Sequence, residues 1–250
     1  MALFLNPISL INRAILTGVV VAIVLSNTLV GAGARTRVGL VLGGGGARGA
    51  AHIGVLEVLH EQRIPIDCLS GTSMGALVSG AFAAGLSPDE MISVIERANW
   101  QDMFNDNPPI YDMNPRKKSL SRRFVTGAEM GFTENGPEAL PGVIDGQKIK
   151  LFINKLVHSE YGDPQIEQMH LPLSIVSTDL VTGGKVVFRE GSLTKAMRAS
   201  MSIPAAMTPV KDGEKLLVDG ALVANIPIDE VREQCNPDIV IAVNVGSPLL

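Results

Sequence analysis

Two glycine-rich turns, each lying between a short apolar run and a helical pattern, restrict most strongly how this chain can fold. The first apolar run, residues 37–42, ends at four glycines, and residues 50–62 then place apolar side chains four apart. The second run, residues 64–69, leads to a Gly-x-Ser-x-Gly turn, and residues 76–84 follow with almost no polar face. Strand, helix, strand, helix is typical of a parallel sheet covered by helices, so the pattern predicts an α/β fold.

The rest of the chain predicts further elements of one domain around a less regular middle. Residues 99–146 are rich in proline, glycine, asparagine and charge, so we expect long loops that form an insertion or a lid. An apolar helix face runs through residues 149–157, and residues 193–198 predict a short helix. Later strands are expected at residues 173–176, 185–188, 215–218 and 239–245.

The first 34 residues do not resemble the remainder. Arg13 is the only charged residue before Arg35, an apolar run covers residues 14–25, and Ala32-Gly33-Ala34 ends the segment. This order is typical of a secretory signal peptide, and the apolar core is shorter than the about 20 residues of a bilayer span. We expect cleavage after residue 34 and export to the periplasm, the outer membrane or the medium. An uncleaved membrane anchor is the alternative.

Charge and cysteine content argue against two classes of protein. The net charge of −4 provides no positive field to neutralise phosphates, so we expect no nucleic-acid partner. The two cysteines, Cys68 and Cys235, do not form a C-x-x-C pattern, so no metal site is expected. They could pair in an oxidising compartment, but the sequence favours two buried free thiols.

The glycine loop after the first strand is suited to hold negative charge, because glycines expose backbone N–H groups and a helix begins there. The loop comprises Gly43, Gly44, Gly45, Gly46, Ala47, Arg48 and Gly49. Its Gly-x-Gly-x-x-Gly spacing matches the dinucleotide fingerprint, with Asp67 lying 18 positions beyond the last glycine. Ala50 stands where a phosphate loop requires lysine. The loop alone leaves a dinucleotide site, an oxyanion hole and an ordinary tight turn open.

The second turn carries a candidate nucleophile. Small residues on both sides of a serine permit the strained strand-to-helix turn that exposes its hydroxyl. Adjacent strands of a parallel sheet would bring this turn and the glycine loop to the same edge, which dinucleotide binding does not explain. The turn comprises Gly71, Thr72, Ser73, Met74 and Gly75.

A serine nucleophile needs a proton acceptor, and the position of the histidines is unfavourable. In the usual α/β-hydrolase order the histidine comes after the acid, yet no histidine follows Asp219. We expect each histidine to tolerate alanine with most activity retained: His52, His60, His158 and His170. Asp219 follows an apolar run and precedes Gly220 and Ala221, a position that by itself indicates a turn more strongly than a base.

These motifs together resemble the patatin-like phospholipases, a family that uses a Ser–Asp dyad without histidine. The glycine loop with Arg48, the turn around Ser73 and the Asp219-Gly220-Ala221 group occur in the family's order and wide spacing. Residues 51–56, 177–180 and 198–204 look similar as well, and the likeness runs from about Val38 to the last residue. Residues 108–109 and 142–147 resemble the secreted bacterial branch, whose domain precedes a membrane-embedded portion.

The resemblance implies a three-layer α/β/α patatin-like fold with a mainly parallel central sheet over residues 35–250. It implies a serine lipid acyl hydrolase of the phospholipase A, lysophospholipase or esterase type, with a membrane lipid or phospholipid as substrate and no cofactor. Ser73 would be the nucleophile and Asp219 its base. The N–H groups around Gly44, Gly45 and Gly46 would form the oxyanion hole, steadied by Arg48. No catalytic role is expected for Asp179, Ser200 or Ser202.

Two rival classes make different predictions. A dinucleotide-binding oxidoreductase would leave Ser73 idle, and a non-enzymatic membrane-surface protein would not need the intact motifs. A fluorophosphonate probe labels an activated serine and would separate both from a hydrolase.

A basic group in the middle segment is a candidate contact for anionic lipid head groups, although a solvated loop explains it too. Its members are Arg116, Lys117, Lys118, Arg122 and Arg123.

The last apolar run, residues 239–245, reads as a buried parallel strand, and such strands are covered by helices on both faces. Because no helix follows, we expect the domain to be truncated here and the natural protein to continue beyond Leu250.

Overall fold

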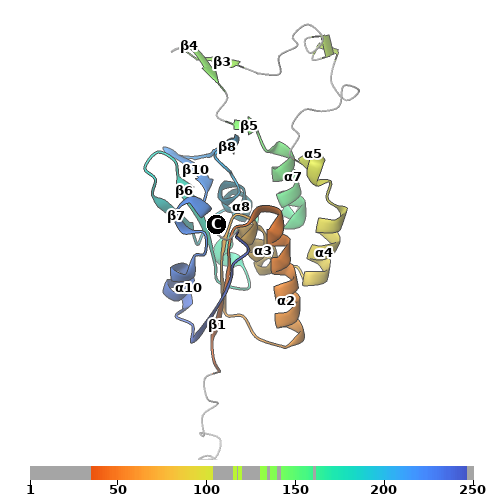
Figure 1. Cartoon of the computed structure of the whole chain (residues 1–250), viewed down its shortest axis with the longest axis vertical. Helices are drawn as coiled ribbons and strands as arrows, with labels where there is room; N and C mark the ends of the chain where they lie inside the picture. Colours follow the sequence, from red (N-terminus) through yellow and green to blue (C-terminus); the bar gives the residue numbers. More distant parts are fainter. Residues whose placement is uncertain are drawn as a thin grey trace, which may run out of the picture. The chain divides into compact units, whose positions relative to one another are not determined.

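The computed structural model describes residues 35–103, 115–116, 118–119, 130–133, 136–139, 142–159 and 162–246. At its centre is a seven-stranded sheet with the order β11-β1-β2-β6-β10-β9 and with β7 also paired to β6 (Figure 1). The strands are β1 (Val38–Leu42), β2 (Cys68–Thr72), β6 (Leu173–Asp179), β7 (Lys185–Phe188), β9 (Val210–Asp212), β10 (Lys215–Asp219) and β11 (Ile239–Val243).

The sheet has a parallel half and an antiparallel half. Strands β11, β1, β2 and β6 run parallel to one another, whereas β7 and β10 pair antiparallel with β6, and β9 pairs antiparallel with β10. The sheet is therefore mixed rather than mainly parallel as predicted. The predicted α/β class is confirmed, and the two strand–turn–helix units lie in the parallel half. The second strand begins at Cys68 rather than at residue 64. Pro65 lacks the N–H that a strand within the sheet would donate, and the Asp67 carboxylate caps the Val38 N–H at 2.7 Å.

Helices cover both faces of the sheet and make three layers (Figure 1). Residues alternate along β1, so that Leu40 and Leu42 enter the larger core while Val41 enters a smaller one on the opposite face. The larger core lies beneath α2 (Ala51–Glu61), α3 (Met74–Ala83), α4 (Pro88–Arg97), α7 (Gln147–Leu156) and α8 (Leu193–Ser200). The smaller core lies beneath α10 (Ile228–Cys235).

The local sequence explains where α3, α4 and α7 form and which of their faces are buried. Nine of the ten residues of α3 are buried, as its lack of a polar face predicts. Helix α4 begins at a capping box in which the Ser87 hydroxyl accepts from the Glu90 N–H and the Glu90 carboxylate accepts from the Ser87 N–H. The apolar face predicted for residues 149–157 is the buried face of α7.

The middle segment is described only in part. It contains α5 (Trp100–Met103), a hairpin of β3 (Met130–Thr133) and β4 (Gly136–Ala139), and β5 (Gly142–Ile144), which pairs parallel with β8 (Ala205–Met207). Two short elements, η3 (Ile166–Gln168) and α9 (Ala221–Ala224), complete the described chain together with η1 (Gly46–Ala50). The lid and the signal peptide stay predictions, because residues 1–34 and most of 104–129 lie outside the described residues. Within the described residues, no helix combines the length and apolar character needed to cross a bilayer.

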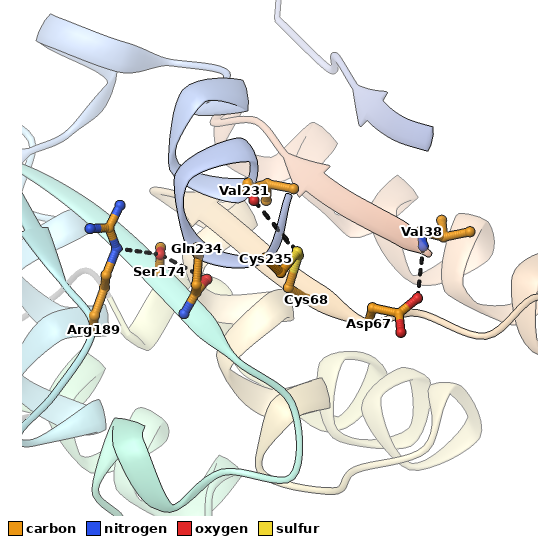
Figure 2. Close-up of a disulfide and its surroundings, with 8 residues drawn as sticks. All are labelled: Val38, Asp67, Cys68, Ser174, Arg189, Val231, Gln234 and Cys235. Atoms are coloured by element: carbon orange, nitrogen blue, oxygen red, sulfur yellow. Dashed lines mark hydrogen bonds between the residues drawn. A yellow bond between two sulfur atoms is a disulfide. The ribbon is translucent and has the colours of Figure 1, made fainter. Parts of the chain in front are cut away.

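The expectation of two free thiols is wrong. Cys68 and Cys235 form a disulfide whose Cα atoms are 6.4 Å apart, within the usual span of such bonds (Figure 2). Cys68 points from β2 toward the α10 face, and Cys235 ends α10, so the fold brings together residues that are 167 positions apart. Beside them, Arg189 donates to the hydroxyl of Ser174, which donates to Gln234 of α10.

Candidate active site

The turn after β2 holds Ser73 in a strained backbone conformation. Ser73 has φ 55° and ψ −121°, a region that non-glycine residues seldom occupy, and α3 begins directly after it. Gly75 permits the turn, because a Cβ at this position would lie 2.0 Å from the Leu42 carbonyl oxygen at the end of β1. The main chain of the elbow is therefore packed against the end of β1, the strand that leads into the glycine loop.

Strand pairing brings Asp219 to Ser73. Residues 175–178 of β6 pair with β7 along one side of β6. Strands β2 and β10 each pair with β6 residues that also pair with β7, so both lie along the other side of β6. Strand β2 ends at Thr72 opposite Val176, and β10 arrives antiparallel and ends at Asp219 opposite Ser177. Two strand ends thus meet at adjacent positions of β6, and the Ser73 hydroxyl donates to Asp219 Oδ2 at 2.6 Å.

Asp219 is a buried carboxylate with few hydrogen-bond donors. Its Oδ1 accepts from the Ala221 N–H at 2.8 Å, and its own N–H donates to the Ser202 carbonyl. Burial raises the pKa of Asp219, and the hydrogen bonds from Ser73 and Ala221 offset only part of this rise. The carboxylate is thereby a stronger proton acceptor than an exposed aspartate.

The glycine loop reaches the nucleophile. A Cβ on Gly44 would lie 3.1 Å from the Ser73 Cβ, so the two turns are in contact. The Gly44 N–H, however, donates to Asn225, at 3.1 Å to its Oδ1 and 3.3 Å to its carbonyl oxygen. The N–H groups of Gly45 and Gly46 have no acceptor within the part of the chain that the structure describes. They are the loop's better candidates for an oxyanion hole, whereas the N–H of Gly44 is engaged.

A buried serine that sequence reasoning set aside supports the nucleophile. The Ser200 hydroxyl accepts from the Ser73 N–H at 2.8 Å and donates to the Val176 carbonyl at 2.6 Å. Ser200 therefore ties the strained residue to β6 and acts on its position, not on the reacting atoms. Ser202 instead bonds with Arg198, and the Asp179 carboxylate accepts from the Val181 N–H and the Thr182 hydroxyl in a turn.

The dinucleotide interpretation fails on the position of Asp67. Its carboxylate binds the N–H of Val38 at the start of β1, whereas the glycine loop follows the end of that strand (Figure 2). An acidic residue that binds a ribose must lie beside the phosphate loop. Asp67 lies instead at the end of the sheet where β1 begins, away from the glycine loop.

An apolar cavity of about 230 Å³ opens beside the nucleophile. Ser73 and the loop residues Gly46 and Ala47 form one wall. The others come mainly from the apolar side chains of Ile95, Trp100, Met201, Ile203 and Met207. These side chains come from α4, α5 and the segment after α8 and share no period along the chain, so no sequence pattern predicts the cavity.

Comparison with known proteins identifies the family to which the chain belongs. Residues 40–232 match the family model of the patatin-like phospholipases. The chain belongs to this family. An uncharacterised NTE family protein of Mycobacterium tuberculosis is 32% identical to the patatin-like domain over 204 residues, which are 81% of this chain and 29% of that protein. The neuropathy target esterase of Drosophila melanogaster is 32% identical over 214 residues, 84% of this chain and 13% of that protein.

The patatin fold also matches a solved structure. The crystal structure of VipD from Legionella pneumophila superposes with a TM-score of 0.50 at 16% identity, covering 77% of this chain and 47% of that chain. This likeness supports the fold alone. The chain spans less than a third of the length of the two curated relatives, so their activities are not transferred with the family name.

The remaining candidates of the patatin-like domain lie apart from the dyad. His60, His158 and His170 are exposed, whereas His52 is fully buried and contacts the glycine loop. Arg48 is exposed on η1, and its steadying role stays a prediction. Of the basic group, the structure describes an exposed Arg116 and a half-buried Lys118; its other members, Lys117, Arg122 and Arg123, lie outside the described residues.

Proposed function

We propose that the patatin-like domain is a serine hydrolase that cleaves fatty-acyl esters of lipids. The observation that carries this proposal is the 2.6 Å hydrogen bond from the Ser73 hydroxyl to a buried Asp219 carboxylate beside an apolar cavity. The name of the Drosophila relative, an esterase, agrees with it.

The first half of the reaction transfers the acyl group to Ser73. Asp219 takes the hydroxyl proton while Oγ bonds to the ester carbonyl carbon, and the carbonyl oxygen becomes an oxyanion. The N–H groups of Gly45 and Gly46 would stabilise this oxyanion, each contributing roughly 3–4 kcal/mol. When the tetrahedral intermediate collapses, the ester bond breaks and the leaving alcohol takes the proton from Asp219.

The second half releases the fatty acid. Water gives a proton to Asp219 as its oxygen attacks the acyl carbon, and the same N–H groups stabilise the second oxyanion. The bond to Ser73 Oγ then breaks, and the proton returns to the serine. The raised pKa of Asp219 suits both steps, because a buried carboxylate binds the transferred proton more tightly than an exposed one.

The cavity supports an acyl chain as the bound group. Its side-chain walls are aliphatic, aromatic or thioether, and they begin at the nucleophile. Ile203, which lines the cavity, is 48% exposed, so that the apolar wall reaches the surface. Such a rim would contact lipid aggregates, and the basic group in the middle segment would add attraction to anionic head groups.

The test combines labelling with an ester panel. A fluorophosphonate probe should label the wild-type protein and the Ser93→Ala control on α4 but not Ser73→Ala. Hydrolysis of p-nitrophenyl esters should rise from short to medium acyl chains as the chain fills the cavity. An unlabelled wild-type protein that unfolds cooperatively would refute the proposal.

We also propose that the domain works in an oxidising compartment after export. The disulfide between Cys68 and Cys235 supports this proposal, because such bonds persist mainly outside reducing cytosol. N-terminal sequencing of exported material should find Arg35 first. A Met1 terminus on membrane-bound protein would favour the anchor instead.

A further inference from the structure

One peptide group in the glycine loop is held at both of its ends by side chains. It is the peptide that joins Gly43 to Gly44, at the point where the chain leaves β1. The Gly43 carbonyl accepts from His52 Nε2 at 2.7 Å, and the Gly44 N–H donates to Asn225 Oδ1 at 3.1 Å. The Asn225 amide also lies 3.4 Å from the Gly44 carbonyl oxygen.

The hydrogen bond to Gly43 determines which ring nitrogen of His52 carries the proton. A carbonyl oxygen only accepts, so Nε2 carries the proton in this contact. Nδ1 is buried and has no partner among the described residues, so a proton there would bring an unpaired charge into the core. Burial lowers the pKa of His52, which agrees with a neutral ring. His52 is therefore a permanent donor to the loop and is not available as a base.

Asn225 lies at the end of α9 and links the loop to the rest of the site. Its preceding residue contacts the elbow, because the Ala224 carbonyl accepts from the Thr72 hydroxyl at 2.9 Å. Its hydrogen-bond partner Gly44 also contacts the elbow at Ser73. A shift of Asn225 would move the glycine loop relative to the nucleophile.

We propose that His52 and Asn225 are positioning residues that clamp the Gly43–Gly44 peptide and thereby aim the N–H groups of Gly45 and Gly46 at the reacting carbonyl. The inference rests on the proposed function, because an aim matters only if an oxyanion forms. These two N–H groups belong to the next two peptides along the chain. Glycines do little to restrict their own backbone, so the direction of these donors depends on the clamped peptide before them.

The contact with Gly43 distinguishes His52, which is fully buried, from His60, His158 and His170, which are exposed. We therefore expect turnover to fall when the His52 donor is removed. This revises the expectation from the sequence that His52 tolerates substitution, although His52 acts on position and is not the base. A loosened oxyanion hole should lower kcat with little change in KM, because the ground-state ester makes few contacts with it.

The decisive experiment compares variants by kcat per titrated active site. His52→Leu and Asn225→Ala should each lower kcat about 10- to 100-fold with KM within about twofold. His52→Gln, whose amide N–H reaches the same place, should recover most of that loss. His60→Leu, the same change at an exposed position of α2, should leave kcat unchanged. The double variant should fall less than the product of the two single losses, because both act on one peptide.

A second measurement does not depend on activity. Nitrogen-15 NMR should find His52 in the Nε2–H form, and His52→Leu should speed amide exchange at Gly44, whose N–H is hydrogen-bonded to Asn225, more than at α10. Wild-type kcat in both clamp variants, or a lower melting temperature with an unchanged kcat, would overturn the positioning role. A wild-type protein without esterase activity would instead refute the proposed function, while the NMR result would still decide whether the clamp exists.

Discussion

The two glycine-rich turns of this domain lie at the same edge of the sheet but are held in different ways. The elbow around Ser73 is buried on both sides of the nucleophile, and its backbone touches Leu42, β6 and α8. The glycine loop becomes exposed from Gly46 to Arg48 and is fixed through His52 and Asn225. The nucleophile is therefore placed by sheet pairing and packing, whereas the Gly43–Gly44 peptide of the glycine loop is held by hydrogen bonds with His52 and with the side chain and backbone of Asn225.

The difference predicts which substitutions separate chemistry from folding. The largest loss should come from the dyad itself: Ser73→Ala and Asp219→Asn should each lower kcat at least about 1000-fold. Because burial raises the pKa of Asp219, its ionised form costs stability as pH rises through that pKa. Asp219→Asn should thus unfold at the same or a higher temperature at pH 7. Residual activity near that of wild type, or an unfolded variant, would contradict this assignment.

Gly75 in the elbow should tolerate added volume far less than Gly46 in the glycine loop. Gly75→Ala places a Cβ 2.0 Å from the Leu42 carbonyl oxygen, so backbone must move and stability should fall by about 3 kcal/mol or more. Gly46→Ala meets no atom within 4 Å and is strained only by its φ of +57°, which costs about 1–2 kcal/mol. Urea unfolding of both variants tests the order, and equal losses would show that these two positions are packed alike.

The pH profile should report the base through its raised pKa. Since Asp219 must be ionised to accept the Ser73 proton, kcat/KM should fall about tenfold per pH unit below that pKa. The acid limb should lie above the ordinary aspartate value of 3.8. His60→Leu should leave the limb in place. A limb that disappears in a single histidine variant would transfer the role of base to that histidine.

The smallest effect should occur away from both turns. Gly54 lies on the exposed side of α2, and a Cβ there meets no atom within 4 Å. Gly54→Ala should raise the free energy of unfolding by about 0.5–1 kcal/mol with kcat unchanged. A changed kcat would show that α2 transmits strain to the glycine loop through His52.

Sequence reasoning reached the fold because each element carries its own local pattern, such as the apolar face of α7 and the uninterrupted apolar run of β1. It reached the pairing of Ser73 with Asp219 only through family resemblance. The meeting of β2 and β10 on one edge of β6 depends on strand order, which no local pattern records. The same holds for the disulfide, whose cysteines lie on a strand and a helix end 167 residues apart.

The contacts of Ser200, Asn225 and His52 were missed for a related reason. A short polar side chain in an apolar segment indicates burial, but its partner is set by tertiary packing. Of the three, His52 has the position that best indicates its partner. It lies in the first turn of α2, from which a histidine side chain can reach back to the glycine loop. Its neighbours in the sequence, Ala51 and Ile53, are apolar and do not indicate that partner.

The meeting of β2 and β10 beside β6 also bears on how such a domain can diversify. Both members of the dyad are placed by sheet registers, while Trp100 enters the cavity from α5, at the entrance of the irregular middle segment. Insertions, deletions or exchanges in that segment can reshape what the cavity accepts without altering either register. This part of the cavity wall and the dyad thus lie on separate stretches of chain, so that a lineage, or a protein engineer, can change the surroundings of Trp100 and retain Ser73 and Asp219.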